Sequence, residues 1–309
     1  MLNRTDSRRA LQHAGCPLAK RTINVRRLRV ASGRRLTLEK YDPADTVPFA
    51  TNEGARRLLN KRVRRLYDLT QLLFAQNRWS VLFIFQAMDG AGKDSAIKHV
   101  MRGLDPKATQ VFSFKLPSTE ELKHDFMWRC MKSLPERGRI GIFNRSYYEE
   151  VLVSRVHPEL VEHQQLPKRC VSKHIWRDRF EDIRGIERYL ARNGTVIRKI
   201  FLNVSKTEQR RRFLERLNDP AKKWKFSVND VNERLRWKEY MAAYEKALCS
   251  TSTPEAPWYI VPADHKWFTR LAVAEIAIET LESLDLQVPQ LSNGDHRALR
   301  HAKRRLRAR

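Results

Sequence analysis

Residues 87–94 (AMDGAGKD) combine small residues, two carboxylates and a lysine in a pattern suited to binding phosphate. A glycine-rich turn presents backbone N–H groups to phosphate oxygens, and a lysine at the start of the following helix can reach the same oxygens. The stretch approximates the P-loop pattern G-x-x-x-x-G-K-[ST], although Ala87 replaces the first glycine and Asp94 replaces the hydroxyl residue. An ordinary turn between a strand and a helix is the alternative. The residues predicted to bind phosphate are Gly90, Ala91, Gly92, Lys93 and Asp94.

A carboxylate inside this loop and a polar pair farther along the chain are the candidate catalytic groups. Asp89 can either repel a phosphate or hold a Mg²⁺ ion that bridges to one. Asn144 and Arg145 follow the apolar run 139–143 (RIGIF), where a P-loop enzyme needs a polar or acidic group to orient Mg²⁺. The guanidinium of Arg145 matches the geometry of a phosphoryl group. We therefore predict catalytic roles for Asp89, Lys93 and Arg145, and a metal site that includes Asp89 and Asn144.

Cations recur in two later stretches. Residues 209–227 (QRRRFLERLNDPAKKWKFS) contain seven of them, including Arg212 and Arg216, around a turn that contains proline. Kinases close a lid over the transferring phosphates, so we predict a basic lid here; a solvated helix end is the alternative. Residues 195–204 (TVIRKIFLNV) carry Arg198 and Lys199 inside an apolar run. Interior cations need partners, so either one of them faces the anion site or both simply flank the core.

The elements that must position these residues alternate between strands and helices. Apolar runs predict strands at 81–86, 109–115, 139–143, 195–204 and 258–261. Helical spacing predicts helices at 52–77, 95–100, 118–134, 172–193, 205–217, 227–248 and 267–284. The predicted caps are Ser118 with Glu121, Ser205 with Glu208, and Ser227. Strands that alternate with helices favour a parallel sheet covered on both faces. The predicted fold class is therefore α/β, a P-loop sheet flanked by helices and completed by a helical lid.

Charge and chain length predict three regions. Residues 1–50 are basic and partly extended, either a mobile arm or a disordered leader; residues 51–289 form a P-loop domain with its lid at 209–227; residues 290–309 form a basic, disordered tail. The net charge is +26 over 309 residues. An excess of that size implies a polyanionic partner, which can be nucleic acid, an anionic membrane surface or an acidic polymer. A solvated surface of one sign is the remaining alternative.

The composition also excludes some classes of protein. The sequence contains no apolar run of about 18 residues, so no transmembrane helix is expected. The first residues lack the apolar core of a secretory signal. Four cysteines, none in a C-x-x-C pair, indicate reduced thiols in a cytoplasmic protein and argue against a disulfide or zinc framework.

Several segments, taken in order, resemble the polyphosphate kinase 2 family, whose members are polyphosphate:nucleotide phosphotransferases. These segments are QAMDGAGKD, SFKLPS, GIFNRSYYEEVLV, RRRFLERLNDPAKKWKFS, WKEYMAAYEKAL and APWYIVPADHKWF, and the likeness extends over residues 36–289. The ordered set is specific, whereas the P-loop alone is not. GIFNRSYYE together with NDPAKKWKFS is most similar to the branch that phosphorylates nucleoside mono- and diphosphates.

This resemblance implies a thymidylate-kinase-like P-loop fold and a reversible, Mg²⁺-dependent transfer of a terminal phosphoryl group from inorganic polyphosphate to ADP, GDP or AMP. The polyanion suggested by the charge would then be polyphosphate, with no membrane or nucleic-acid partner, in a homodimer or homotetramer. The family's loop aspartate and P-loop lysine match Asp89 and Lys93. Its second motif, in which many members have Asp-Arg, matches Asn144 and Arg145. Its basic positions near the phosphate path match Lys115 and Lys199, and its lid contains Arg212 and Arg216.

Two other functions remain open at this point. An ATP-dependent nucleoside monophosphate kinase shares the P-loop and the arginine at a strand end, but it does not predict the charge of +26 or the NDPAKKWKFS lid. A nucleic-acid-binding P-loop protein fits the charge. The sequence, however, lacks clusters of stacking aromatic residues and a recognisable recognition helix.

Overall fold

A central strand, β1 (Ser80–Gln86), organises the fold. The computed structural model describes residues 22–33, 35–102 and 104–307. In this part of the chain, five strands form one parallel sheet in the order β2-β3-β1-β4-β5. The other strands are β2 (Thr109–Ser113), β3 (Ile140–Asn144), β4 (Thr195–Asn203) and β5 (Trp258–Pro262). The predicted α/β class with a parallel sheet is confirmed.

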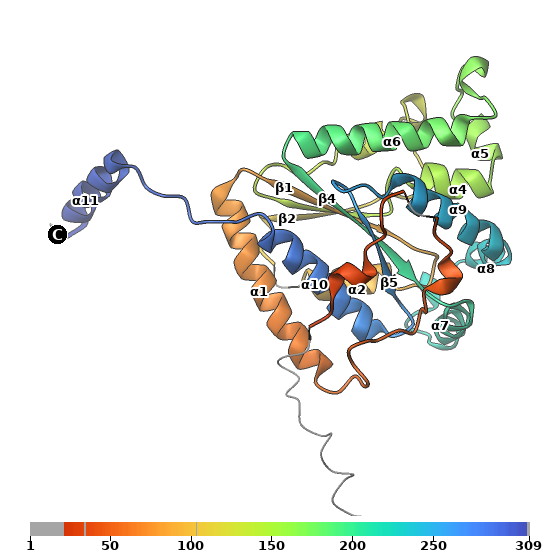
Figure 1. Cartoon of the computed structure of the whole chain (residues 1–309), viewed down its shortest axis with the longest axis horizontal. Helices are drawn as coiled ribbons and strands as arrows, with labels where there is room; N and C mark the ends of the chain where they lie inside the picture. Colours follow the sequence, from red (N-terminus) through yellow and green to blue (C-terminus); the bar gives the residue numbers. More distant parts are fainter. Residues whose placement is uncertain (1–21, 34, 103, 308–309) are drawn as a thin grey trace, which may run out of the picture.

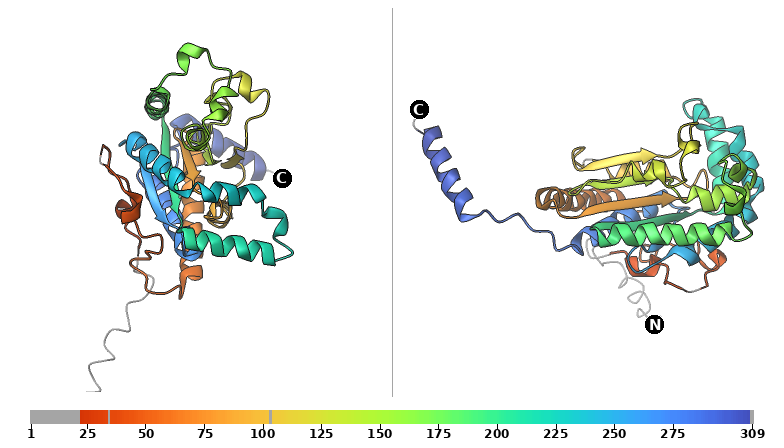
Figure 2. Two further views of the ribbon diagram at one scale, coloured as in Figure 1. Left: turned by 90° about the vertical axis from the view of Figure 1, so that its right-hand side faces the viewer. Right: turned by 90° about the horizontal axis from the view of Figure 1, so that it is seen from above.

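Helices cover both faces of the sheet (Figures 1 and 2). One face is packed by α1 (Ala55–Gln76), α2 (Lys93–Val100) and α10 (Lys266–Glu282). The other face is packed by α4 (Glu149–Val156), α6 (Ile175–Arg192) and α9 (Trp237–Thr251). This two-sided cover explains why all seven residues of β1 are buried and why its sequence does not alternate between apolar and polar residues.

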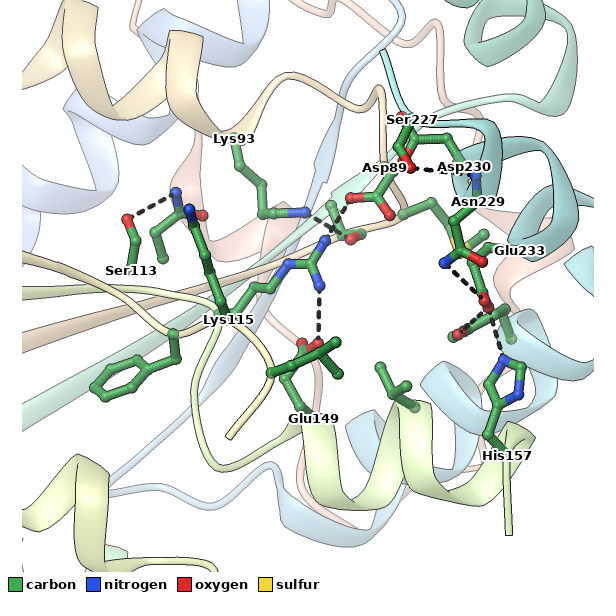
Figure 3. Close-up of a pocket in the computed structure, with 18 of the residues that line it drawn as sticks. Asp89, Lys93, Ser113, Lys115, Glu149, His157, Ser227, Asn229, Asp230 and Glu233 are labelled. Carbon is green, nitrogen blue, oxygen red and sulfur yellow. Dashed lines mark hydrogen bonds and ion pairs between the residues drawn. The ribbon is translucent and has the colours of Figure 1, made fainter. Parts of the chain in front are cut away.

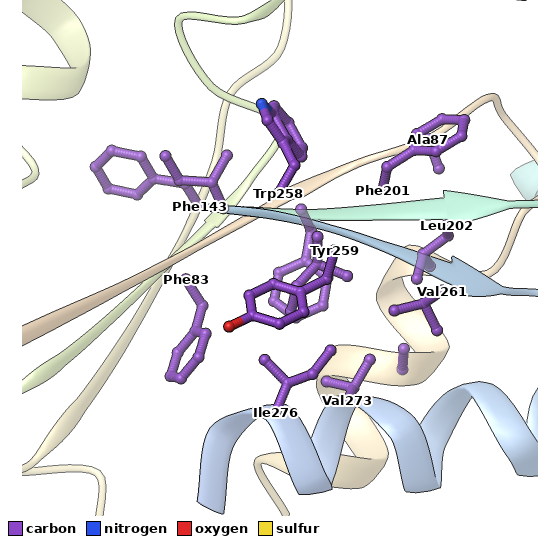
Figure 4. Close-up of a cluster of buried hydrophobic side chains, with 14 of the residues drawn as sticks. Phe83, Ala87, Phe143, Phe201, Leu202, Trp258, Tyr259, Val261, Val273 and Ile276 are labelled. Atoms are coloured by element: carbon purple, nitrogen blue, oxygen red, sulfur yellow. The ribbon is translucent and has the colours of Figure 1, made fainter. Parts of the chain in front are cut away.

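The core lies between the sheet and these two helical layers. Figure 4 shows Phe83 and Tyr259 on the side of α10, near Val273 and Ile276, while Trp258 lies on the opposite side of the strands. Burial of apolar surface on both faces stabilises the sheet by about 25 cal/mol for each Å² removed from water. The sheet is therefore a rigid base, and its carboxyl edge is where ligands of open α/β folds bind.

The segment before α1 is described over residues 22–33 and 35–54. It contains two short 3-10 helices, η2 (Val25–Leu28) and η3 (Leu38–Lys40), and buries Ile23, Val30 and Phe49. The N–H of Val30 donates to the carbonyl oxygen of Trp258 over 2.8 Å, beside an antiparallel bridge between Arg29 and Tyr259. This part of the expected mobile arm is therefore packed on the edge strand β5. Residues 1–21 lie outside the described residues.

Two predicted helices are interrupted. The capping pair predicted at Ser118 and Glu121 forms, but it opens only η4 (Glu121–Lys123), because Asp125 caps the N–H of Met127 and starts a new turn. The predicted helix 227–248 is divided at Arg236 into α8 (Val228–Leu235) and α9. The remaining short elements are α3 (Trp128–Met131), α5 (Glu159–Glu162), η5 (Lys168–Cys170) and η6 (Lys223–Lys225).

Residues 293–307 form a helix where the sequence predicted a disordered tail. This helix, α11 (Asn293–Arg307), has no buried residue and stands apart from the rest of the chain (Figure 1). Ser292 begins it: the hydroxyl of Ser292 accepts from the N–H of Asp295, and the carboxylate of Asp295 accepts from the N–H of Ser292. None of the described helices is long and apolar enough to cross a membrane.

Candidate active site

The phosphate loop joins β1 to α2 at the carboxyl edge of the sheet. Gly90 and Gly92 have φ angles of +81° and +102°, in the left-handed region that favours glycine. A Cβ atom on Gly90 would lie 2.8 Å from Cε1 of Phe213 on helix α7 (Lys206–Asn218). The glycine is therefore required both by the turn and by the close approach of α7. The first N–H groups of α2 have no partner within the helix and can bind an anion.

Lys93 is held at the base of this loop. Its side chain is buried, and Nζ donates to the carbonyl oxygen of Ala87 over 2.8 Å. Burial lowers the pKa of Lys93, and the neighbouring charge of Arg145 lowers it further, whereas Asp89 opposes both effects. The contact uses a backbone carbonyl, so it is available with alanine at position 87. Lys93 also lines the adjoining cavity, where its charge can meet a phosphate.

Arg145 is fixed between two carboxylates. Its guanidinium donates to Asp89 over 2.6 Å and to Glu149, at the start of α4, over 3.3 Å (Figure 3). The backbone of Arg145 has a φ of +65°, which is unusual for a residue other than glycine. Burial raises the pKa of Asp89, but Lys93 and Arg145 outweigh burial and hold this pKa below its usual value. The pair therefore presents an ionised carboxylate beside a fixed cation.

Asn144 and Asp94 meet beside the loop because the carboxyl end of β3 lies next to that of β1. The amide of Asn144 donates to Asp94 over 2.7 Å, and its Oδ1 is buried with no hydrogen-bond partner among the described residues. Mg²⁺ takes oxygen ligands, keeps several waters and is completed by substrate phosphates. The oxygens of Asp89, Asp94 and Asn144 fit such an ion. No group of three or more His, Cys, Asp and Glu side chains in the described part could hold a metal, so phosphates would have to complete the site.

The predicted lid, residues 209–227, contains most of α7 together with η6 and ends just before α8. We use the name lid for α7, η6 and α8 together, which project beyond the sheet (Figure 1). Ser205 caps α7 as predicted, accepting from the N–H of Glu208. Arg216 on α7 lies 3.8 Å from Asp230 on α8, and its charge helps to lower the pKa of Asp89. Arg234 on α8 donates to Gln209 on α7 over 2.7 Å. The two helices are thus joined by side-chain contacts.

Arg212 differs from its predicted role. It is only 3 % exposed and donates to the carbonyl oxygens of Gly90 and Ala91 in the phosphate loop, and to those of Ala263 and Asp264 after β5. Its Nε also donates to Glu208 over 2.7 Å. These contacts occupy the guanidinium, so Arg212 positions the loop from outside and does not face the cavity.

Lys199 also lies elsewhere than predicted, since it was expected near the phosphate path. It is fully buried in β4, where Nζ donates to Glu187 over 2.6 Å, to the Tyr148 hydroxyl over 2.9 Å and to the Thr251 carbonyl over 2.7 Å. Three donors meet three acceptors. Burial lowers the pKa of Lys199, and its ion pair with Glu187 opposes this effect. Lys199 is therefore a core residue away from the phosphate path.

The cavity of about 810 Å³ beside the loop has two ends of different charge. The lysines and arginine of the lining, Lys93, Lys115 and Arg145, all lie at one end, together with the carboxylates of Asp89, Asp94 and Glu149. The other end, between α4 and α8, is lined by Ser227, Asn229, Asp230, Glu233 and His157 (Figure 3). His157, directly after α4, lies 2.8 Å from Glu233, which also accepts from the Tyr240 hydroxyl over 2.6 Å. These contacts join the lid to the body of the protein across the mouth of the cavity.

Several of these residues could not be assigned from the sequence. Glu149 lies four residues after Arg145, and that helical spacing was a usable signal. His157 and Glu233 are 76 residues apart and belong to no motif. Gln209, whose amide donates to the carbonyl oxygen of Asp89 over 2.7 Å, was hidden within the basic stretch.

Comparison with known proteins identifies the family. The profile of the family "Polyphosphate kinase 2 (PPK2)" matches residues 50–289. The chain belongs to the polyphosphate kinase 2 family. It is 49% identical over 286 residues to an "ADP-polyphosphate phosphotransferase" of Rhodopseudomonas palustris, a match that covers 92% of this chain and 99% of that one. It is 42% identical to an "AMP/ADP-polyphosphate phosphotransferase" of Meiothermus ruber, covering 86% and 96% of the two chains.

A solved structure supports the same assignment. The crystal structure of polyphosphate kinase 2 from Arthrobacter aurescens TC1 is similar with a TM-score of 0.80 and 39% identity, over 88% of this chain and 94% of that one. The family and the shared fold make this chain a phosphotransferase of the polyphosphate kinase 2 type. The resemblance seen in the sequence is confirmed at the level of family and fold.

Proposed function

We propose that this protein transfers the terminal phosphoryl group of inorganic polyphosphate to a purine nucleoside diphosphate or monophosphate, in a reversible reaction that requires Mg²⁺. The observation that carries the proposal is the meeting of Lys93, Arg145 and Asp89 in one cavity at the end of a phosphate loop. The names of the two relatives, which act with ADP or with AMP and ADP, support these acceptors.

The charges of the cavity suggest how the two substrates lie. A phosphate chain is attracted to the end that contains Lys93, Arg145 and Lys115, because no lysine or arginine of the cavity lining lies at the other end. Asp230 and Glu233 can instead accept hydrogen bonds from the hydroxyl and amino groups of a nucleoside. The donor chain is thus placed at the loop and the nucleoside under the lid, with the reacting phosphates between them.

The chain's own residues supply positioning and electrostatic stabilisation. Phosphoryl transfer passes through a transition state with charge on its equatorial oxygens, and fixed cations stabilise this charge. Lys93 and Arg145 are such cations, and Arg145 is oriented in advance by Asp89 and Glu149. Asp89 stays ionised and can orient the acceptor. A bound Mg²⁺, held by Asp89, Asp94 and Asn144, would neutralise the negative charge of the phosphates.

Nucleotide synthesis without ATP tests the proposal. Purified protein is mixed with Mg²⁺ and long-chain polyphosphate, and AMP, ADP, GMP and GDP are supplied separately. We expect nucleoside triphosphate from the diphosphates and diphosphate from AMP. Product from diphosphates alone would restrict the acceptor. If only ATP serves as a donor, the protein is instead a nucleoside phosphate kinase and the proposal is wrong.

A further inference from the structure

Helix α11 lies outside both the catalytic core and the family match. The match ends at residue 289, and the helix occupies Asn293–Arg307. Residues 287–307 are all exposed. Figure 1 shows α11 on the opposite side of the domain from α7 and α8, after an extended connection. The helix therefore contributes nothing to the core, and packing does not explain its sequence.

Arginines on α11 form a stripe along one face. They recur at intervals of three and four residues, so they point in similar directions over about 15 Å of helix. The stripe consists of Arg297, Arg300, Arg304 and Arg307. None of the four forms an ion pair with a carboxylate of the described residues, although each adjacent pair has the spacing at which like charges destabilise a helix. The arrangement therefore favours a polyanion that would neutralise all four at once.

We propose that α11 is a second binding site for inorganic polyphosphate, contacting the chain at a distance from the end held in the cavity. This inference rests on the proposed function. Charge complementarity is its basis, because polyphosphate is a linear polyanion and the helix presents a linear row of cations. The apolar side of the helix carries two alanines and two leucines, Ala298, Leu299, Ala302 and Leu306, a small surface for burial in a membrane. A second copy of the helix would be repelled.

The separation of α11 from the cavity makes the effect depend on chain length. Two linked sites bind one ligand more tightly only if the ligand can reach both. A long polyphosphate can occupy the cavity with its end and α11 with another part, whereas a short oligophosphate cannot. Helix α11 should thus lower the KM for long chains, leaving kcat and the KM for short chains unchanged.

The test neutralises the stripe in the full-length protein. The variant carries Arg297→Gln, Arg300→Gln, Arg304→Gln and Arg307→Gln. The control removes the same net charge from exposed positions on or just before α6, with Lys173→Gln, Arg177→Gln, Arg188→Gln and Arg192→Gln. We expect the stripe variant to raise the KM for long-chain polyphosphate about tenfold and the control to change it little. This is less than the roughly 10²–10⁴-fold gain that linked binding sites can give, because Lys303 and Arg305 remain on the helix. The KM for a short oligophosphate should be unchanged in both.

Other results would overturn the inference. Equal changes for long and short chains, or equal changes in the two variants, would mean that only overall charge matters. Direct binding is also measured with long-chain polyphosphate, duplex DNA and phosphatidylserine vesicles as separate probes. If the stripe variant loses binding to DNA or vesicles but keeps its affinity for polyphosphate, α11 serves a different partner. Because binding needs no turnover, it tests α11 even if the proposed reaction fails.

Discussion

The guanidinium of Arg212 lies 2.7 Å from the carbonyl oxygen of Ala91, so the lid helix α7 holds the phosphate loop from its outer side. The same side chain contacts Ala263, after β5, over 2.6 Å. One arginine therefore ties together the lid, the loop and the end of an edge strand. A lid attached in this way cannot shift at α7 without disturbing the loop that binds phosphate.

Replacing Arg212 should lower both the thermal stability and the activity of the protein. Arg212→Met leaves buried carbonyl oxygens of the loop without donors, which costs about 1–3 kcal/mol for each group left unsatisfied. We expect a fall in the melting temperature of several degrees and a higher KM for polyphosphate. Arg211→Met is the matched control, since Arg211 is exposed and, among the residues that the structure describes, pairs only with Glu208 and Glu215. Equal effects of the two substitutions would contradict the conclusion that Arg212 holds the phosphate loop in place.

Lys93→Met tests the phosphate loop. The substitution keeps most of the side-chain volume but removes the charge, and the loss of one stabilising donor commonly lowers kcat by about 10²–10³-fold. Because burial already disfavours the charge of Lys93, the melting temperature should change little. Lys98→Met, an exposed position on the same helix, should leave the rate intact. If Lys93→Met retains its activity, the phosphate loop is not part of the catalytic site.

The buried pair of Lys199 and Glu187 should matter for folding and not for substrate binding. Lys199→Met leaves an unpaired carboxylate in the core, which lowers the free energy of unfolding by about 3–5 kcal/mol. The double variant with Glu187→Gln should recover part of this loss, because no charge is then buried. Denaturant unfolding of both variants measures the effect. If Lys199→Met raises the KM for polyphosphate at a temperature where the variant is fully folded, Lys199 does contribute to polyphosphate binding.

Asn144→Asp tests the proposed metal position. The new carboxylate would face Asp94, whose oxygen lies 2.7 Å from the amide nitrogen of Asn144. Two like charges at that distance repel each other unless a cation lies between them. We expect a lower melting temperature without Mg²⁺, a larger increase on adding Mg²⁺, and half-maximal activity at a lower Mg²⁺ concentration. Asn229→Asp, at the other end of the cavity, is the control. An unchanged Mg²⁺ titration would place the metal elsewhere.

Acidification should reveal the ionised state of Asp89. The folded-state pKa of Asp89 is lowered, so its stabilising contribution is fully present above about pH 4, the usual value of an aspartate, and is lost as the pH falls through the folded-state pKa. The melting temperatures of the wild type and of Asp89→Asn should differ more at about pH 6 than at about pH 3. A constant difference across this range would mean that Arg145 does not hold Asp89 ionised.

The sequence predicted what depends on local pattern. The phosphate loop, the caps at Ser205 and Ser227 and the five strands are encoded by neighbouring residues, and the structure contains them. Position 199 could not be assigned in the same way. Strand β4 is covered on both faces, so alternation gave no sign of where Lys199 points, and its partner Glu187 lies on a different element. Only tertiary packing brings the two together.

The same limit applies to the lid. The basic stretch was recognised as a lid from its charge, but charge alone does not distinguish an arginine facing a substrate from one holding a backbone. Arg212 and Arg216 are four residues apart on α7 and have different surroundings, the first buried against the phosphate loop and the second beside Asp230. The contact of His157 with Glu233 joins two distant segments and required the fold to be known.

The segment before α1, from residue 22 onward, also determines where the chain can be shortened without loss of the fold. The family profile begins at residue 50, yet Ile23, Val25, Leu28 and Val30 already belong to the core. A fragment cut at the family boundary would uncover an apolar groove and free the backbone of β5 at Trp258. Exposed strand edges of that kind pair readily with other chains. The unit that folds is therefore longer than the segment that the family profile matches.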